Sequence, residues 1–406
     1  MNSCKEVCDK DVIGEIHSIL MSEAPDLTLL KRLVKINFGF SPDDTRRLIY
    51  QVTKNLNAAF FPPVTKLEIV HTEGCNLACA YCFEKNMRGR HKIKFDTARK
   101  AVDLLFDYSA GEPVVNILHF GGEPTLNFPS VQKVTEYAEE KAKASGKLVE
   151  FHMTSNGVLI NEEMAGYFSR HKIMVLLSID GLEEEHNRFR VDAKGRGTFA
   201  KVLKSVEILK KSQQWVGVKM TVMPENAPTF FDSVLGLYDL GVNQFLISPA
   251  TGVRWAEDDM NTFARQYGRL YRWYREKPRG DLRIAEFDEV DKYSCFYGCH
   301  AGRNNIAVNV NGDITSCSKI MAINKTRPPD KLGDVNYGLT HLENRFQLAG
   351  CSRLRRACES MGISGDYQGG CFAVNYEENG DLFSPSLQHY AFHKLMVSAC
   401  SMGRET

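Results

Sequence analysis

Strand-like and helix-like segments alternate six times between residues 63 and 250, and this order constrains the fold more than any other feature. The apolar patterns predict strands over residues 66–70, 114–120, 148–153, 173–179, 216–223 and 244–248, with helices over 95–108, 130–144, 162–171, 198–211 and 228–240. Successive strands that are joined by helices pair in parallel with right-handed crossovers. The chain is therefore expected to be an α/β protein built on a parallel sheet.

Three cysteines stand close together in the loop after the first predicted strand. Cys75, Cys79 and Cys82 are spaced four and three residues apart, and Tyr81 directly precedes the last of them. Three thiols cannot pair evenly in disulfides, but thiolates bind iron–sulfur clusters, usually four to a cluster. Three ligands from one loop would leave one iron open to a substrate or cofactor. Zinc is the alternative, although zinc sites usually use paired Cys-x-x-Cys units, and no second pair lies nearby.

The loops after the next three predicted strands carry glycines and small polar residues. The runs are Gly121-Gly122-Glu123-Pro124, Thr154-Ser155-Asn156-Gly157 and Ser178-Ile179-Asp180-Gly181. Ligands of parallel α/β folds bind at the carboxyl ends of the strands, so these loops and the cysteine loop are expected to build one site. Paired glycines let a backbone approach a ligand closely, and Glu123 could accept a hydrogen bond from an ammonium group. The alternatives are ordinary glycine turns and caps of the following helices.

The pattern C-x3-C-x-aromatic-C resembles the signature of the radical S-adenosylmethionine (SAM) enzymes, whose three cysteines hold a [4Fe–4S] cluster. The resemblance implies that the Gly121-Gly122-Glu123 run holds the amino group of SAM and that Tyr81 lies near its adenine. Arg190 could pair with the SAM carboxylate through a forked hydrogen bond, or be an ordinary surface arginine. The run from residue 178 to 199 is similar to a segment of radical SAM peptide and protein maturases. The residues for which the resemblance implies contact with the ribose or carboxylate of SAM are Ser155, Asn156, Ser178 and Asp180.

Seven of the twelve cysteines lie in the last part of the chain. They are Cys295, Cys299, Cys317, Cys351, Cys358, Cys371 and Cys400. With Gly312, the first three form the pattern C-x3-C-x12-G-x4-C, which resembles the start of a SPASM domain, a module that normally holds two auxiliary [4Fe–4S] clusters. Two strands, 305–309 and 313–316, are expected around the turn Asn311-Gly312.

The second half of this cysteine series departs from the SPASM pattern. Its spacing is C-x6-C-x12-C followed by a distant cysteine, which leaves the set one ligand short of eight. By order, the resemblance implies that Cys295, Cys299, Cys317 and Cys371 hold the first auxiliary cluster. Cys351, Cys358 and Cys400 would then hold the second. The alternative is an incomplete first cluster whose open iron binds a substrate thiolate.

The resemblance also implies an architecture for the whole chain. It predicts an α/β fold with a partial (β/α)6 TIM-like barrel, an N-terminal helical region and a C-terminal cysteine-rich SPASM domain. The expected parts are a helical region over 1–62, which is a reduced peptide-recognition element, the barrel over 63–250, a bridging helix and linker over 251–294, and the SPASM domain over 295–406. Cys4 and Cys8 are expected to be unliganded surface thiols.

Composition limits the partners and the location of the chain. Its formal net charge is +1, which offers no electrostatic case for nucleic acid as a partner. No apolar run is long enough for a membrane span, and residues 1–10 are unlike a secretory signal. Twelve cysteines in such a chain favour metal binding over disulfides. These features predict a cytoplasmic protein in a reducing environment, without nucleic-acid or membrane partners.

The resemblance implies that SAM is cleaved reductively and that the resulting 5′-deoxyadenosyl radical abstracts hydrogen from an unactivated carbon. Thioether-forming maturases of the ranthipeptide and SCIFF type are the group most similar, which implies a Cys-containing ribosomal precursor peptide as substrate and a flavodoxin or ferredoxin as electron donor. The alternatives are a C–C crosslinking maturase and an anaerobic sulfatase maturase that makes formylglycine. Sulfatase maturases carry Asp directly after the residue that matches Cys317, whereas this chain has Ser318. A non-catalytic iron–sulfur carrier or a peptide-binding chaperone is a further hypothesis, which the intact cysteine loop disfavours.

Overall fold

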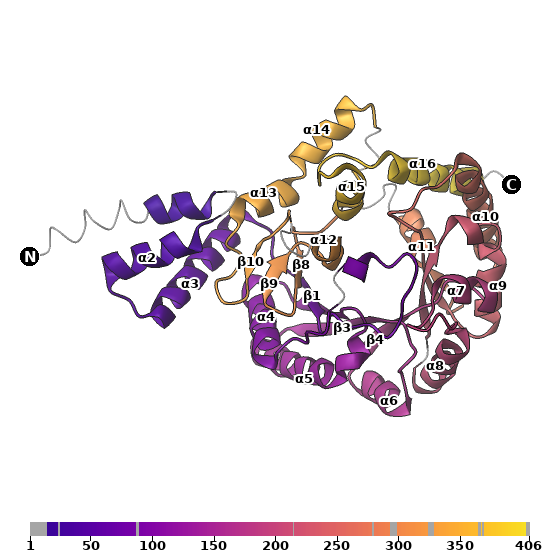
Figure 1. Cartoon of the computed structure of the whole chain (residues 1–406), viewed down its shortest axis with the longest axis horizontal. Helices are drawn as coiled ribbons and strands as arrows, with labels where there is room; N and C mark the ends of the chain where they lie inside the picture. Colours follow the sequence, from indigo (N-terminus) through magenta and orange to yellow (C-terminus); the bar gives the residue numbers. More distant parts are fainter. Residues whose placement is uncertain are drawn as a thin grey trace, which may run out of the picture.

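The structure of the chain is a computed structural model. It describes residues 14–22, 25–86, 89–213, 215–277, 280–292, 299–323, 329–363, 367 and 369–402. Cys4, Cys8 and Cys295 lie outside the described residues, together with the predictions made for them. A curved sheet forms the centre of the molecule, helices surround its outer side, and the N-terminal helices extend from one end (Figure 1).

In the part of the chain that the structure describes, ten strands form one continuous sheet in the order β10-β9-β8-β1-β2-β3-β4-β5-β6-β7. The bounds are β1 Lys66–Val70, β2 Val114–Phe120, β3 Leu148–Ser155, β4 Ile173–Ser178, β5 Gly217–Val222, β6 Gln244–Pro249, β7 Arg283–Ile284, β8 Asn305–Val308, β9 Asp313–Thr315 and β10 Gly333–Asp334. Every neighbouring pair from β8–β1 to β6–β7 is parallel. The six predicted strands are thus confirmed as β1 to β6, and the expected α/β fold with a parallel sheet is confirmed.

Helices lie between successive strands and cover the outer side of the sheet (Figure 1). They are α4 Phe95–Tyr108, α5 Phe128–Ser145, α6 Glu162–Arg170, α7 Glu183–Phe189, α8 Phe199–Ser212 and α9 Phe230–Asp239, with short 3-10 turns η1 Phe83–Asn86, η2 Pro124–Asn127 and η3 Pro224–Asn226. In α5, Val131, Val134 and Ala138 recur at helical spacing and are fully buried on the side that packs against β3. This packing keeps the helices on the outside and leaves the loops at the carboxyl ends of the strands free to form a site.

The predicted hairpin around Asn311-Gly312 is present as β8 and β9, but it is not separate from the barrel sheet. β8 pairs in parallel with β1, and Lys66 lies opposite Asn305. Helix α12 (Ser318–Ile323) follows β9 and packs on η1, the turn directly after the cysteine loop. The C-terminal part of the chain is therefore joined to the barrel through shared sheet hydrogen bonds and lies against the cysteine loop.

Further helices complete the molecule, from α13 beside the N-terminal helices to α10, α11 and α16 at the opposite end (Figure 1). They are α10 Glu257–Glu276, α11 Ala285–Lys292, α13 Leu342–Gly350, α14 Ser352–Ser360, α15 Phe372–Asn379 and α16 Leu387–Met402. The aromatic stripe of α10 is part of the core, because the ring of Phe263 is fully buried and lies 5.4 Å from that of Phe392 on α16. Sequence patterns did not predict α7 or the helices α11 to α16.

The N-terminal helices carry a small core of their own. Helix α2 spans Leu27–Phe38, α3 spans Pro42–Phe60, and residues 14–20 are helical. Ser41 caps α3 by accepting a hydrogen bond from the Asp44 amide at 3.2 Å, as the Ser-Pro-Asp-Asp run predicts. Their buried apolar side chains pack with Leu342 at the start of α13. The N-terminal helices are therefore in contact with α13 of the C-terminal part.

None of the helices in the described ranges is both long enough and apolar enough to cross a bilayer.

Candidate active site

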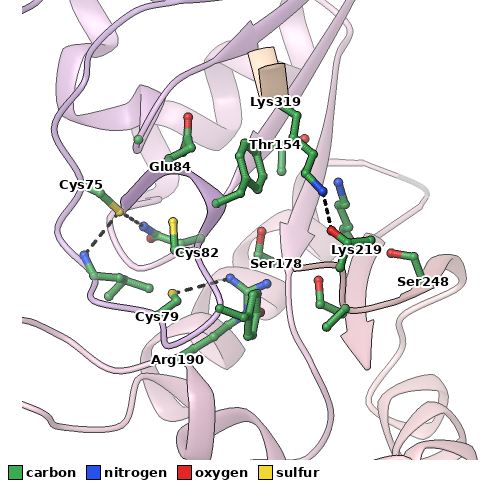
Figure 2. A pocket seen from close by; sticks show the side chains of 18 of the residues that line it. Cys75, Cys79, Cys82, Glu84, Thr154, Ser178, Arg190, Lys219, Ser248 and Lys319 are labelled. Carbon is green, nitrogen blue, oxygen red and sulfur yellow. Dashed lines mark hydrogen bonds between the residues drawn. The ribbon is translucent and has the colours of Figure 1, made fainter. Parts of the chain in front are cut away.

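A cavity of about 370 Å³ opens at the carboxyl ends of the strands, and residues from the barrel and from the C-terminal part line it together. Figure 2 shows the cysteine loop on one side of this cavity and the ends of β5 and β6 on the other. Eight of the nine predicted SAM-binding residues line it, and the ninth, Asp180, lies directly behind. The lining residues that carry the argument below are Cys75, Cys79, Cys82, Tyr81, Glu123, Asn156, Ser178, Arg190, Lys219, Thr221, Ser248, Lys319 and Cys371.

Backbone hydrogen bonds hold the cysteine loop against the segment that follows β4. The Ala78 amide donates to the Val191 carbonyl at 2.7 Å, and the Ala80 amide donates to the Phe189 carbonyl at 3.0 Å. These carbonyls flank Arg190, so the segment that resembles the maturases is the segment that positions the loop. The loop is therefore built by tertiary contacts rather than by its own turns alone.

Three nitrogen donors point at the thiols of the loop. The Leu77 amide lies 3.4 Å from Cys75 Sγ, and Asn156 Nδ2 lies 3.8 Å from the same sulfur. Arg190 Nη1 lies 4.0 Å from Cys79 Sγ (Figure 2). Hydrogen bonds of this kind to cluster-bound sulfur are a recognised means by which proteins tune iron–sulfur centres.

The Cys75 thiol needs a positive partner before it ionises at neutral pH. Burial, together with Glu123 and the neighbouring thiols, raises the pKa of Cys75 to about 12. An iron–sulfur cluster would supply the compensating positive charge, and its three thiolates bind different irons. Among the described residues no group of His, Cys, Asp or Glu is arranged to hold a single metal ion. Three clustered thiols with donors aimed at their sulfurs fit a cluster rather than one ion.

The two glycines after β2 are required by the backbone that passes beside them. A Cβ on Gly121 would overlap the Thr72 carbonyl oxygen, and one on Gly122 would overlap the Gly74 carbonyl oxygen. The Gly122 amide donates to Thr72 at 3.0 Å and the Glu123 amide to Gly74 at 2.9 Å. The paired glycines predict a close backbone approach to a ligand, whereas the approach that the structure shows is made to the chain that leads into the cysteine loop.

Glu123 connects the loops after β2 and β3. Its Oε1 accepts from the Thr125 amide, from the Thr125 hydroxyl and from the Ser155 hydroxyl, at 3.1, 2.6 and 2.8 Å. Its Oε2 accepts from the Asn156 amide at 2.7 Å. Burial raises the pKa of Glu123, and these donors work in the opposite direction. Glu123 and Ser155 thus hold each other in place, and Oε2 retains acceptor capacity towards the cavity.

Asp180 and Arg190 form a buried forked ion pair behind the cysteine loop. Arg190 Nε lies 2.8 Å from Asp180 Oδ2, Arg190 Nη2 lies 3.1 Å from Oδ1, and the Tyr81 hydroxyl also donates to this carboxylate. Burial disfavours the charged guanidinium, but Asp180, Tyr81 and Cys79 outweigh it and raise the pKa of Arg190. The forked partner of Arg190 within the protein is therefore Asp180, and its third nitrogen faces Cys79.

The opposite side of the cavity holds polar residues that sequence reasoning missed. Lys219 and Thr221 come from β5, Ser248 from β6 and Lys319 from α12 (Figure 2). Lys219 is the one charged residue of β5, in the middle of the strand, and this placement was a usable signal. Nothing local in the sequence places Lys319 here, because α12 reaches the cavity through the β8–β9 hairpin.

The C-terminal thiols fall into two surroundings. Burial raises the pKa of Cys299 to about 12, and Cys371 and Cys351 add to this effect. Cys317 has a pKa well above its ordinary value through burial, with Cys371 and Cys299 among its neighbours. Cys358 and Cys400 are buried away from the cavity, and Tyr367 lies near both Cys358 and Cys371. The structure places Cys299 near Cys317 and Cys371, but also near Cys351, so the division of these thiols between two clusters stays a prediction.

A comparison with known proteins matches the barrel part of the chain to a known superfamily. Residues 69–233 match the model of the radical SAM superfamily. An uncharacterized protein of Methanocaldococcus jannaschii is 32% identical over 171 residues, 42% of this chain and 57% of that protein. The serine-type anaerobic sulfatase-maturating enzyme of Klebsiella aerogenes is 24% identical over 73% of this chain and 76% of that enzyme. This part of the chain is a radical SAM domain, and its homologues include members of the SPASM-containing maturase group.

Solved structures share the fold. The chain resembles anSMEcpe with bound AdoMet, the same compound as SAM, at a TM-score of 0.64 and 19% identity, over 83% of this chain and 99% of that one. It also resembles Streptococcus suis SuiB bound to precursor peptide SuiA, at a TM-score of 0.54 and 19% identity, over 84% and 80% of the two chains. At these identities the likeness establishes the fold, a TIM-like radical SAM barrel with further C-terminal structure.

Proposed function

We propose that the chain is a radical SAM peptide maturase that joins a cysteine sulfur of a ribosomal precursor peptide to a carbon atom as a thioether. One observation carries the proposal: Cys371, from the C-terminal thiol group, lines the same cavity as Cys75, Cys79 and Cys82. The loop thiols and the C-terminal thiol Cys371 open onto one cavity. This arrangement supports a reaction in which a cluster on the loop starts the chemistry and a cluster at the C-terminal thiols takes up an electron or holds a sulfur atom. The named maturase relatives and the peptide-bound SuiB structure support a peptide as the substrate.

The residues of the cavity are suited to hold and orient SAM beside the cluster. A reduced [4Fe–4S] cluster held by the three loop thiolates would supply the electron that cleaves SAM to methionine and a 5′-deoxyadenosyl radical. Glu123 Oε2 accepts one hydrogen bond from the chain and has a lone pair available for the SAM amino group. Leu77, Phe83 and Phe120 line the cavity with apolar surface, which excludes water from the reacting carbon.

The proposal includes two auxiliary clusters and an external electron donor. Cys299, Cys317 and Cys371, with Cys295, would hold one cluster, and Cys351, Cys358 and Cys400 would hold the other. A flavodoxin or ferredoxin would reduce the first cluster, and the auxiliary clusters would take up the electron that thioether formation leaves behind. Single Cys→Ala variants test this division through iron content. Unchanged iron in the Cys351, Cys358 and Cys400 variants would contradict it.

Formylglycine formation is the second candidate, because a sulfatase-maturating relative aligns over 73% of this chain. The position that carries Asp in sulfatase maturases is Ser318, whose amide donates to Glu68 Oε2 at 2.9 Å. The carboxylates that line the cavity among described residues are Glu84 and Glu123, and the proposal assigns the free acceptor capacity of Glu123 to the SAM amino group. The lack of an Asp beside Cys317 favours thioether formation.

Anaerobic turnover separates the two reactions. Reconstituted protein, SAM and dithionite should produce 5′-deoxyadenosine, and a coexpressed Cys-containing precursor peptide should lose two hydrogens and one alkylatable thiol per crosslink. A peptide aldehyde that reacts with a hydrazine probe would instead establish formylglycine and overturn the thioether. Mass spectrometry of the treated peptides measures both outcomes.

Variants of the two thiol groups give the matched control. Cys79→Ala should abolish 5′-deoxyadenosine, because the open cluster loses a ligand. Cys371→Ala should leave SAM cleavage measurable while thioether product is lost. Thioether formation at the normal rate in Cys371→Ala would contradict the role given to the shared cavity.

A further inference from the structure

The wall of the cavity opposite the cysteine loop carries an ammonium group that forms no direct ion pair with a carboxylate of the described residues. Lys219 extends from β5, where its backbone pairs with Ser178 of β4, and its side chain lines the cavity (Figure 2). Throughout the described ranges, Lys219 Nζ makes no hydrogen bond and no ion pair. A charged group in this position is exposed to whatever enters the cavity.

The other charges that line the cavity have partners. Arg190 is paired with Asp180 at 2.8 Å, and Lys319 is paired with Glu377 at 3.0 Å. After burial, these two cations are the main groups that lower the pKa of Lys219, while Glu68 and Cys371 act in the opposite direction. Burial and the nearby cations therefore disfavour a charged Lys219 that has no counter-ion. An anion that enters the cavity would supply the counter-charge and offset both effects.

Two hydroxyl groups lie beside this ammonium. Thr221 of β5 and Ser248 of β6 are opposite each other in the parallel register, and both line the cavity. In the part of the chain that the structure describes, neither hydroxyl donates to or accepts from another protein group. One ammonium and two unoccupied hydroxyls on adjacent strands form a donor set suited to a carboxylate.

We propose that Lys219, with Thr221 and Ser248, binds a carboxylate of the substrate peptide, so that the preferred peptide carries an acidic residue or its C-terminus beside the reacting cysteine. The inference rests on the proposed function, because it assumes that a peptide enters this cavity. It adds the chemical class of the recognised residue and the side chain that selects it. The carboxylate has two sources, an Asp or Glu side chain and the free carboxyl terminus, which the test separates.

Binding without turnover tests the inference on the complete, cluster-loaded protein with SAM and no reductant. The probes are fluorescein-labelled synthetic peptides with one cysteine, identical except that Asp or Asn flanks it, each made with an amidated or a free C-terminus. The unmodified protein should bind the Asp peptide, or the free-acid form, about tenfold more tightly than the neutral Asn amide, since a hydrogen bond to a charged group contributes that much. The stronger of the two preferences identifies the source of the carboxylate.

Matched variants decide whether Lys219 carries the preference. Lys219→Gln should abolish it and Lys219→Arg should retain it, because the charge is kept. Lys204→Gln, which removes an exposed charge from α8, should bind like the unmodified protein. Should Lys219→Gln lose iron, Thr221→Val with Ser248→Ala replaces it and should weaken the preference while leaving iron content intact.

Three results would overturn the inference. One is equal binding of all four peptides, and another is a preference that persists in Lys219→Gln. The third is a loss of SAM affinity in Lys219→Gln with unchanged peptide preference, which would assign the ammonium to the SAM carboxylate. Formation of 5′-deoxyadenosine and thioether is measured separately, so a failure of the proposed function is distinguishable from a failure of this selection.

Discussion

At the scale of single residues, the cysteine loop is held by groups that are not cysteines. Gly122 lets the β2 loop pass against Gly74, and Asp180 holds Arg190 so that its third nitrogen faces Cys79. The contacts Gly122–Gly74 and Arg190–Cys79 both join loops that follow different strands. The thiols therefore depend on residues whose contribution is steric or electrostatic.

Gly122→Ala should destabilise the protein by about 1–3 kcal/mol, because the new Cβ overlaps a backbone oxygen that cannot move without shifting the cysteine loop. The amount of iron that the variant retains after reconstitution should fall together with its free energy of unfolding. Gly111→Ala is the matched control, since a Cβ there meets open space. Denaturant unfolding under anoxic conditions and iron analysis measure both, and equal effects from the two variants would refute the steric explanation.

Asp180→Asn should cost about 3–5 kcal/mol, since it leaves the buried Arg190 guanidinium without its counter-charge. SAM affinity should fall as well, because Tyr81 loses its acceptor and Arg190 is freed to move. Asp43→Asn, which breaks an exposed pair with Arg46, should have little effect. Unfolding and equilibrium SAM binding are the measurements, and an unfolding free energy like that of Asp43→Asn would exclude the ion pair as a structural element.

At the scale of elements, a buried hydrogen-bonded chain joins β1, β2 and α5 beneath the site. His71 contacts Ser130 at 2.9 Å and His119 at 2.8 Å, and His119 contacts Thr135 at 3.2 Å. Burial lowers the pKa of His71 to about 3 and that of His119 well below its ordinary value. Both imidazoles are therefore neutral in the folded protein at any working pH.

Because of the buried His71–His119 pair, the stability of the folded protein is expected to decline in weak acid. Unfolded histidine has a pKa of about 6.5, so below that pH the unfolded state binds protons that the folded state refuses. The stabilisation is thus complete above about pH 6.5 and is lost as pH falls, by up to about 1.4 kcal/mol per pH unit for each histidine.

Replacing both histidines with Gln should flatten this decline. His17→Gln, at an exposed position of the first helical segment, is the control and should keep the full slope. Anoxic denaturant titrations between about pH 7.5 and 5.5 measure the slope, and a double variant that declines as steeply as the unmodified protein would rule out the histidine pair as its cause.

At the scale of the whole molecule, Arg345 connects three parts of the chain. It lies on α13, is almost fully buried, and donates to Asn57 Oδ1 of α3 at 2.5 Å and to the carbonyls of Pro62 and Gly302 at 2.7 and 3.2 Å. Burial lowers the pKa of Arg345 to about 10, since within the described ranges its acceptors are neutral oxygens. The N-terminal helices, the entry to β1 and the C-terminal part therefore meet at one guanidinium.

Arg345→Met should destabilise the protein by about 3 kcal/mol or more, because several buried acceptors lose their donor at once. The N-terminal helices should also become more sensitive to proteolysis. Arg353→Met, on the exposed side of α14, is the matched control. Unfolding and limited proteolysis measure the effect, and a normal proteolysis pattern in Arg345→Met would mean that the small N-terminal core alone holds these helices.

Much of the barrel follows from the sequence, because its evidence is local. The β1–β6 strands were predictable from apolar runs, and the cysteine, Gly-Gly-Glu and Ser-x-Asp loops from their position directly after strands. Their convergence follows from parallel pairing alone, since it puts all carboxyl ends at one edge. The nearness of Glu123 to Asn156, and of Arg190 to Cys79, depends on how the strands are arranged and was not predictable residue by residue.

The sequence by itself determined the α/β class, the three-thiol loop and the rim of polar residues around it. Only the tertiary structure decided that β8 adds to β1, that α12 brings Lys319 to the rim, and that Cys371 faces the loop from more than two hundred residues away in the chain. The reason is physical: helical and strand periodicity act over a few residues, whereas sheet edges and cavities form wherever distant segments bury the most surface. The role proposed for Lys219 also depends on the tertiary structure, because the cavity, and not the sequence of β5, leaves its side chain without an ion-pair partner among the described residues.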